Sequence, residues 1–329
     1  MDPAQETGSL VVAGCDDGLV RVWDLESGSQ CRPPLTAGTD ALTGVATGTV
    51  GGRTVAVSTG HVGPVRSWWL DTGTPAGPPV PGTAPVALGR VDGALVIVAA
   101  NDRDDRLGVW DLATGHGVHA SEHHGGPLEA LTVTTLGDRQ AVISGDGRGQ
   151  IAVSDLSTGR LTVRMAGGHR ASVWALVTTV VEGRPVVVSG GNDGTVRRWR
   201  LDSGAPVGEP LHGHHGPLDA PGRIHALAII TTQDGSAVVS SGWDGELWLW
   251  DLARGERVGV PLDDGYGDVQ TLAVSRVGGR EVVVGGGIDE PVLRVWDLAT
   301  MTLQRVLPSG GHVLALASAS GQGAGGGSP

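Results

Sequence analysis

Residues 189–204, SGGNDGTVRRWRLDSG, form a unit that recurs along the chain. Its tryptophan position is filled seven times, at steps of 42 to 51 residues, by Trp23, Trp68, Trp110, Ser154, Trp199, Trp250 and Trp296. Leucine stands two residues later in every copy, and glycine three residues after that in six of the seven copies. A fixed register of this kind is typical of a repeat architecture, in which each copy forms one supersecondary unit.

A Trp-Asp pair stands at this position in four copies, for example at Trp23-Asp24 and Trp110-Asp111. These residues resemble the WD-repeat family, and the resemblance extends from residue 9 to residue 319. It implies an all-β fold, a seven-bladed β-propeller with four antiparallel strands in each blade.

Each copy carries the pattern of four short strands. In the fifth copy we expect strands at residues 173–178, 185–189, 195–201 and about 205–211. The apolar run Val186-Val187-Val188 leaves no polar face, which is typical of a sheet covered on both sides. The Asp193-Gly194 pair predicts a hairpin turn between the second and third strands, because glycine adopts a positive φ easily.

The two ends of the repeat array complement each other. The first copy begins with a second strand at residues 10–13, and the last residues of the array, 313–317, form an unaccompanied first strand. The last strand can therefore complete the first blade and close the ring, which removes exposed sheet edges. We expect one propeller domain over residues 1–320 and a disordered Gly/Ser-rich segment over residues 321–329.

The composition excludes several functions. The chain has no lysine, which excludes a Schiff-base lysine and a phosphate-binding loop ending in Gly-Lys-Ser/Thr. The net charge of −12 opposes binding to nucleic acid. Residues with AT-rich codons are scarce, which indicates a GC-rich, bacterial genome.

We expect a cytoplasmic location, because no signal peptide or membrane-spanning stretch is evident. Cys15 and Cys31 are expected at opposite ends of one blade and therefore reduced.

The resemblance also implies a structural hydrogen-bond network of His, Asp, Ser and Trp within a blade. The fifth copy has all four members: His169, Asp193, Ser189 and Trp199. The fourth copy keeps His124 and Ser144 but has Arg148 and Ser154 at the Asp and Trp positions. In the first copy Ala13 replaces the serine, and the histidine at 312 stands too close to its strand.

An insertion at residues 211–223 displaces the histidine of the sixth copy. One of its histidines is expected to be the displaced network member, and a zinc site is the alternative for His212, His214 and His215. The acidic turns at 101–105 and 263–264 lack the spacing of a calcium loop, so we expect solvated turns there.

Propellers of this family present a face of loops to proteins or peptides, so the resemblance implies a non-catalytic interaction scaffold without a cofactor. The alternative is a propeller enzyme, a metal-dependent hydrolase or lyase with its site at the central channel. The positions expected at the channel mouth, in register with Trp174, are Thr43, Ala87, Glu129, His225, Gln270 and Leu314. One carboxylate and one histidine are too few to favour catalysis.

Two tryptophans outside the repeat position mark a candidate partner site. Trp243 occupies the turn position that Asn192 has in the fifth copy, Trp174 opens a first strand one blade earlier, and Arg148 lies in a neighbouring turn. Tryptophan and arginine carry much of the binding energy of interfaces. The candidate partner-binding residues are Trp174, Trp243, Arg148, Asn192, Glu129, His225 and Gln270.

In the alternative interpretation, Trp174 wedges between blades and Trp243 covers the insertion. We expect a monomer that binds protein or peptide, and neither nucleic acid nor membrane.

Overall fold

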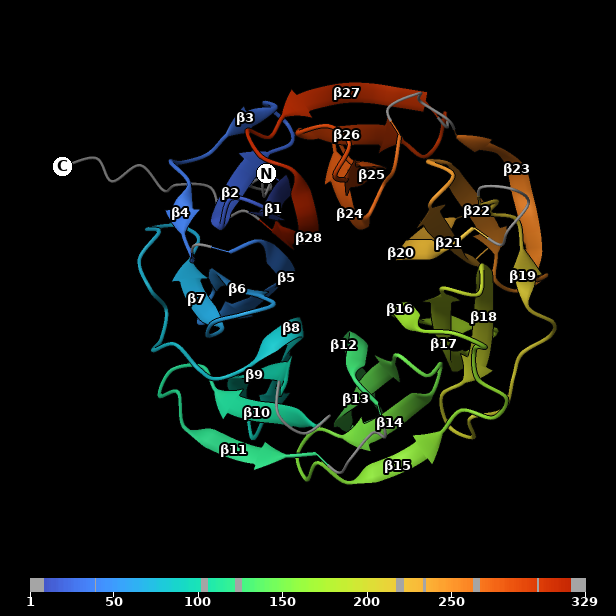
Figure 1. Ribbon diagram of the computed structural model, residues 1–329, viewed down its shortest axis with the longest axis horizontal. Helices are drawn as coiled ribbons and strands as arrows, with labels where there is room; N and C mark the ends of the chain where they lie inside the picture. Colours follow the sequence, from blue (N-terminus) through green and yellow to red (C-terminus); the bar gives the residue numbers. More distant parts are fainter. Residues whose placement is uncertain are drawn as a thin grey trace, which may run out of the picture.

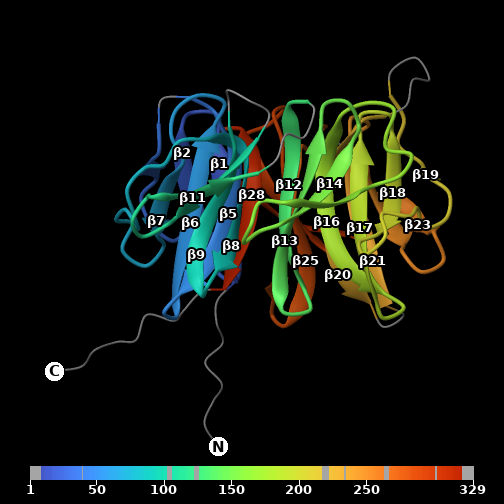
Figure 2. The ribbon, with the colours of Figure 1, turned by 90° about the horizontal axis from the view of Figure 1, so that it is seen from below.

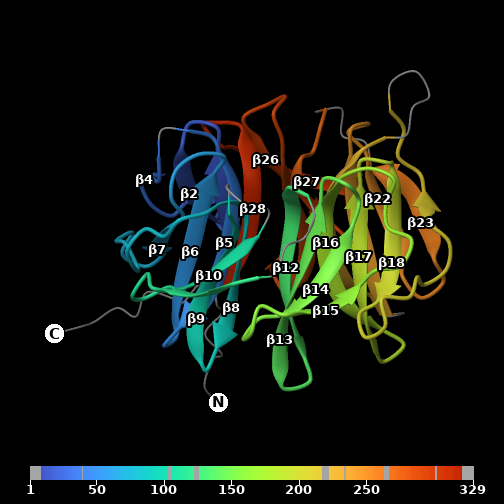
Figure 3. The same cartoon turned by 60° about the horizontal axis from the view of Figure 1, so that its bottom comes forward.

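The computed structural model describes residues 9–38, 40–101, 106–121, 126–216, 222–232, 235–262, 267–300 and 302–320. Seven sheets surround a central axis, so the predicted seven-bladed β-propeller is confirmed (Figure 1). In the side views the strands run between two opposite faces of the ring (Figures 2 and 3). We number the blades by the sequence copy that each contains.

The first strand of each blade is innermost and borders the channel (Figure 1). These strands are β5 (Leu42–Val50), β8 (Thr83–Val91), β12 (Leu128–Leu136), β16 (Val173–Val181), β20 (Ile224–Thr232), β24 (Thr271–Val277) and β28 (Val313–Ser320). The second strands are β1 (Ser9–Cys15), β6 (Arg53–Gly60), β9 (Ala94–Ala100), β13 (Arg139–Asp146), β17 (Arg184–Gly191), β21 (Gly235–Gly242) and β25 (Arg280–Gly286).

The third strands carry the repeated tryptophan position. They are β2 (Leu19–Asp24), β7 (Arg66–Trp69), β10 (Leu107–Asp111), β14 (Ile151–Asp155), β18 (Thr195–Arg200), β22 (Leu247–Asp251) and β26 (Val292–Asp297). The outermost strands are β3 (Ser29–Gln30), β4 (Leu35–Thr36), β11 (Gly117–Ala120), β15 (Leu161–Arg164), β19 (Leu211–His212), β23 (Glu256–Leu262) and β27 (Thr302–Pro308).

The hydrophobic core lies between blades rather than within one sheet. Between the fifth and sixth blades, Val186 and Val188 of β17 pack in one cluster with Val238 and Trp250 of the next sheet. All four side chains are buried. Burying a valine fully stabilises a fold by about 1.5–3 kcal/mol, so the runs that are apolar on both faces hold neighbouring blades together.

The predicted ring closure is confirmed. Strand β28 pairs antiparallel with β1, with Val11 opposite Ser318 and Val12 opposite Ala317. The two strands lie side by side in the ring although they come from opposite ends of the chain (Figure 1).

The outermost strands are less regular than expected. In the fifth blade the predicted strand at 205–211 is reduced to Leu211–His212 and an isolated bridge between Trp199 and Pro206. Three strands form the sheet of the second blade, and residues 75 and 80 add only isolated bridges. Both segments contain prolines, which have no backbone N–H to donate to a neighbouring strand.

The connections of the propeller are divided between its two faces. Hairpins between the first and second strands lie on one face, and turns between the second and third strands lie on the other (Figures 2 and 3). We call the second face the loop face. Gly194 and Gly245 both adopt φ +75° in its hairpin turns, as the Asp-Gly pairs predict.

Both cysteines are free, Cys15 buried and Cys31 exposed. Their predicted placement at opposite ends of the blade is wrong. The Cys31 amide donates to the Val22 carbonyl, 2.8 Å away, so Cys31 lies beside the middle of β2. The chain turns back tightly at Gly28 after β2, which brings Cys31 along that strand.

Candidate partner-binding site

β-Bulges place side chains from different blades at the mouth of the channel. In the fifth blade Val173 pairs with Gly191 and Ala175 with Gly190, so Trp174 between them has no paired residue. A bulge redirects a side chain and interrupts the alternation of the strand. The same shift occurs at Thr43, Glu129, His225 and Leu314.

The third blade differs from the prediction, because its mouth residue is Pro85 and not Ala87. Ala87 is paired with Val98 within the sheet. The register shift lies between Thr83 and Val86, so Pro85 falls in the bulge. Pro85 stands 25 residues before Trp110, the same offset that separates Trp174 from Trp199. That constant offset is the sequence signal that identifies Pro85.

A cavity of about 690 Å³ opens at the mouth on the loop face. It is lined by Thr43, His61, Ala84, Pro85, Leu128, Glu129, Trp174, Arg223, His225, Trp243, Asp268, Gln270 and Ile288. The structure therefore brings together five of the seven predicted partner-binding residues: Trp174, Trp243, Glu129, His225 and Gln270. We call this space the mouth cavity.

Arg148 and Asn192 do not line the mouth cavity. Arg148 is exposed in the turn after β13, and its side chain packs beside Gly126 of its own blade. Asn192 follows β17, and its amide donates to the Ser172 carbonyl at 2.8 Å. Both residues share the loop face with the cavity, but their turns hold them against their own blades.

Arg223 connects the two tryptophans of the site. Its guanidinium carbon lies 4.3 Å from the ring centroid of Trp243 and 5.6 Å from that of Trp174. Trp243 is 45% exposed, so neither tryptophan is isolated and one remains open to solvent. The sequence prediction did not include Arg223, which directly precedes β20 at the end of the insertion.

A polar chain continues from Trp174 into the seventh blade. The rings of Trp174 and His225 lie 5.4 Å apart, and His225 Nδ1 is 2.9 Å from Asp268 Oδ1. Gln270 Nε2 donates to the second Asp268 oxygen at 3.2 Å. Asp268, which the sequence prediction also missed, is thus hydrogen-bonded through both carboxylate oxygens.

Glu129 stands on the fourth blade of the same cavity. Burial raises the pKa of its carboxyl, because a low-dielectric environment disfavours the charged form, and the neighbouring charge of His61 lowers that pKa in part.

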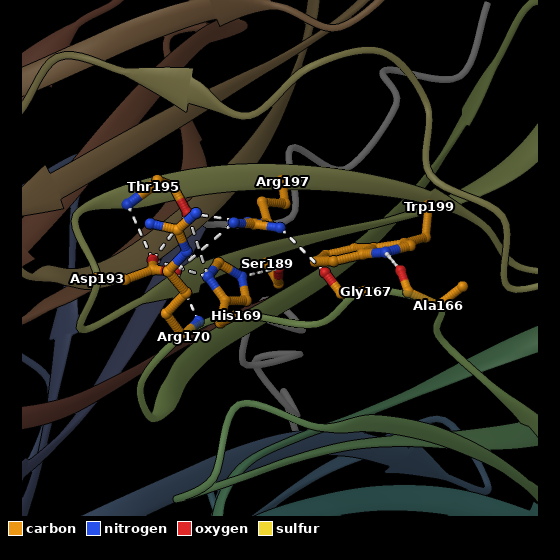
Figure 4. Close-up of polar contacts among 9 residues, drawn as sticks. All are labelled: Ala166, Gly167, His169, Arg170, Ser189, Asp193, Thr195, Arg197 and Trp199. Carbon is orange, nitrogen blue, oxygen red and sulfur yellow. Dashed lines mark hydrogen bonds and ion pairs between the residues drawn. The ribbon is translucent and has the colours of Figure 1, made fainter.

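Three of the four network residues of the fifth blade are joined by hydrogen bonds, with His169 between Asp193 and Ser189 (Figure 4). His169 Nδ1 is 2.9 Å from Asp193 Oδ1, and its Nε2 is 2.6 Å from Ser189 Oγ. Burial raises the pKa of the Asp193 carboxyl. The hydrogen bond from His169 and the charge of that ring have a larger, opposite effect, so the pKa lies well below its usual range.

Trp199 differs from the expected arrangement, because its Nε1 donates to the Ala166 carbonyl at 3.4 Å and not to Ser189. Its ring meets His169 edge-on, with centroids 5.6 Å apart. His169 lies against Ser189 at 2.6 Å, and the Trp199 N–H turns instead to the loop before that histidine.

His214 is the displaced network member of the sixth blade. Its Nδ1 lies 2.8 Å from Asp244 Oδ1 and its Nε2 lies 2.8 Å from Ser240 Oγ. Trp250 Nε1 also donates to Ser240 Oγ, at 2.8 Å. The expectation that the insertion only displaces the histidine, and does not remove it, is consistent with this geometry.

His212 and His215 are exposed on either side of His214. The described residues contain no group of three or more potential ligands that could hold a metal ion.

In the first blade Arg21 takes over the contact with the network aspartate, donating to Asp17 at 2.6 Å. His312 instead uses its backbone amide, which donates to Asp16.

Some predicted features lie outside the described residues. These are His124, the acidic residues 102–105 and 263–264, part of the insertion at 217–221, and the segment 321–329.

The geometry defines a seven-bladed propeller whose loop face carries an aromatic and charged cavity at the axis. Three segments match the family described as "WD domain, G-beta repeat", at residues 5–24, 161–200 and 206–251. These matches show that the chain is similar to WD-repeat proteins in part of its length.

The chain is also similar in sequence to two curated proteins. The chain is 25% identical over 247 residues to the kinesin-like protein KIF21A of Homo sapiens, covering 67% of this chain and 14% of that protein. It is 27% identical over 183 residues to a guanine nucleotide-binding protein subunit beta of Oryza sativa subsp. japonica, covering 53% of this chain and 43% of the relative. The chain thus spans less than half the length of these relatives.

The crystal structure of the computationally designed Ika8 protein has a similar fold, with a TM-score of 0.64 and 24% identity. The superposition covers 95% of this chain and 91% of the designed one. Among the described residues, no helix is long and apolar enough to cross a membrane.

Proposed function

We propose that this protein is a non-catalytic interaction scaffold that binds a peptide or protein partner at the mouth cavity of its loop face. The observation that supports this proposal most is the joining of Trp174 and Trp243 by Arg223 around an open cavity. Tryptophan and arginine are the residues enriched at the energetic centres of protein interfaces. By name, the rice relative is a subunit of a larger assembly.

Binding is favoured over catalysis by the polar groups of the cavity. Its described lining contains no serine or cysteine to serve as a nucleophile. His225 and Gln270 bind both oxygens of Asp268, which fixes this carboxylate at the cavity wall. We further propose that the protein acts in the cytoplasm as a monomer and without a cofactor.

The test compares three variants of the full chain: Trp174→Ala, Trp243→Ala and Trp69→Ala. Trp69 is a matched control, because it also stacks on an arginine, Arg53, but lies outside the mouth cavity. Each variant is immobilised, exposed to a lysate of the source organism, and the captured proteins are identified by mass spectrometry. Melting temperatures are measured in parallel.

We expect at least one protein to be retained by the wild type and by Trp69→Ala but lost from Trp174→Ala and Trp243→Ala. That protein should bind the wild type when both are purified. If every captured protein binds all variants equally, the mouth cavity is not the interaction site. A large fall in melting temperature for both cavity variants would instead identify the two tryptophans as core residues.

A further inference from the structure

The guanidinium of Arg223 lies against aromatic rings, and its N–H groups have no acceptor among the described residues. It lies 4.3 Å from the Trp243 ring and 5.6 Å from the Trp174 ring. In the described part of the chain it makes no hydrogen bond and no ion pair. An arginine normally satisfies several of its five donors, so these groups are available to a ligand.

Arg53, which also stacks on a tryptophan, shows what satisfied donors look like. Arg53 lies 4.2 Å from the Trp69 ring and binds the two oxygens of Asp71 at 2.7 and 2.8 Å. Arg257 stacks on Trp248 at 4.3 Å, but it lies on the outermost strand β23, away from the cavity. Arg223 thus combines ring stacking, free donors and a position on the cavity wall.

This arrangement argues against a cationic ligand between the tryptophans. The guanidinium already lies over both rings, at 4.3 Å from Trp243 and 5.6 Å from Trp174, so a partner's lysine or arginine between the rings would first have to displace Arg223. A planar guanidinium with free N–H groups instead complements a carboxylate or phosphate, which it binds through two parallel hydrogen bonds. The stacked rings hold the guanidinium in advance, which lowers the entropy cost of binding.

Neither of the two carboxylates that line the cavity forms an ion pair with Arg223 among the described residues. Asp268 is bonded to His225 and Gln270. Glu129 lies on the fourth blade, two blades before the one that carries Arg223. The positive charge of Arg223 is therefore not paired within the described residues.

Apolar surface borders the free guanidinium. Trp243 is 45% exposed and Ile288, in the corresponding turn of the next blade, is 47% exposed. Both residues line the mouth cavity together with Arg223. A partner that places an anionic group on Arg223 would bring its neighbouring residues against these two side chains.

We infer that the mouth cavity recognises an acidic peptide segment, in which a carboxylate binds Arg223 and an adjacent apolar side chain packs against Trp243 and Ile288. This inference rests on the proposed function and specifies the chemistry of its partner. Removing the guanidinium should lower the affinity for such a peptide about tenfold or more, because the variant loses hydrogen bonds to a charged group.

The test is selection of a phage-displayed library of random twelve-residue peptides on the full chain. The same selection is made on Arg223→Gln, on Trp243→Ala and on the stacked control Arg257→Gln. We expect the wild type and Arg257→Gln to enrich peptides with Asp or Glu beside an apolar residue, and Arg223→Gln to lose the acidic preference.

Synthetic versions of one enriched peptide then identify the source of the negative charge. Fluorescence polarisation compares the peptide with its Glu→Gln or Asp→Asn form, with a form that has a free C-terminal carboxylate in place of the side-chain acid, and with a phosphoserine form. The peptide with the side-chain carboxylate is expected to bind best, and raising the salt concentration should weaken its binding. Stronger binding of the C-terminal or phosphoserine form would overturn the side-chain assignment.

The outcomes separate this inference from the proposed function. Enriched peptides that are neutral or basic, but that still require Trp243, would overturn the acidic assignment and leave the scaffold proposal intact. An acidic preference unchanged in Arg223→Gln would also overturn it. If no enriched peptide depends on Trp243 or Arg223, peptide binding at this cavity is wrong altogether.

Discussion

Deletion of residues 309–329 removes β28 and should destabilise the whole ring. Within β28, Val313 is fully buried, Leu316 is 9% exposed and Ala315 is 7% exposed. Full burial of a valine or leucine stabilises by about 1.5–3 kcal/mol, so Val313 and Leu316 alone account for about 3–6 kcal/mol. Strand β1 also loses its partner from Ser9 to Cys15. A typical domain is stable by only about 5–15 kcal/mol, so the deletion should remove a large part of the stability.

The assay is thermal unfolding by circular dichroism, with deletion of residues 321–329 alone as the control. We expect the longer deletion to lower the melting temperature on the order of 10 °C or to abolish the cooperative transition, and the control to melt like the full chain. A synthetic peptide of residues 309–320 should restore part of the loss in a concentration-dependent way. If the chain without β28 melts cooperatively at the temperature of the full chain, the closing strand does not stabilise the ring.

Two further predictions concern single side chains. His214→Ala removes the partner of Asp244 and Ser240 and should lower the free energy of unfolding in urea by about 1–3 kcal/mol. Substitution of the adjacent, exposed residue, His215→Ala, should change it by less than about 0.5 kcal/mol. Equal effects would show that the two histidines have the same role. Burial raises the pKa of the Cys15 thiol to about 11, so this thiol is almost entirely protonated at pH 8 and shielded from solvent. A thiol reagent should therefore modify only the exposed Cys31 in the native chain, and both cysteines after denaturation. Rapid modification of both native thiols would contradict the buried position of Cys15.

The fold could be predicted from the sequence because the repeat fixes its geometry several times over. One copy of the pattern around Trp199 would define a hairpin at most, but seven copies in register define the number of blades and their order. Ring closure followed from the strand content of the first and last copies, and the pairing of β28 with β1 confirms it. The outermost strands were harder to predict. Pro206 has no backbone N–H to donate to the neighbouring strand, so the chain there forms only an isolated bridge.

The mouth cavity was only partly predictable, for a physical reason that separates its residues into two kinds. Residues such as Trp174 and His225 lie at a fixed offset from the repeated tryptophan, and the bulge of each innermost strand turns them into the channel. Arg223 and Asp268 each lie two residues before a mouth residue, at a position that holds Pro127 or Ser172 in other blades, so the register gives their position but not their residue type.

Register therefore predicts the ring of mouth residues, whereas the connections determine how that ring is charged. In this chain the 51-residue step between Trp199 and Trp250 is the longest of the six steps between copies. The additional residues of that step end at Arg223, which lies next to Trp174 and Trp243. A lengthened connection between the fifth and sixth blades thus supplies Arg223, the cavity cation that lies over both rings, which is why we place the specificity of the site there.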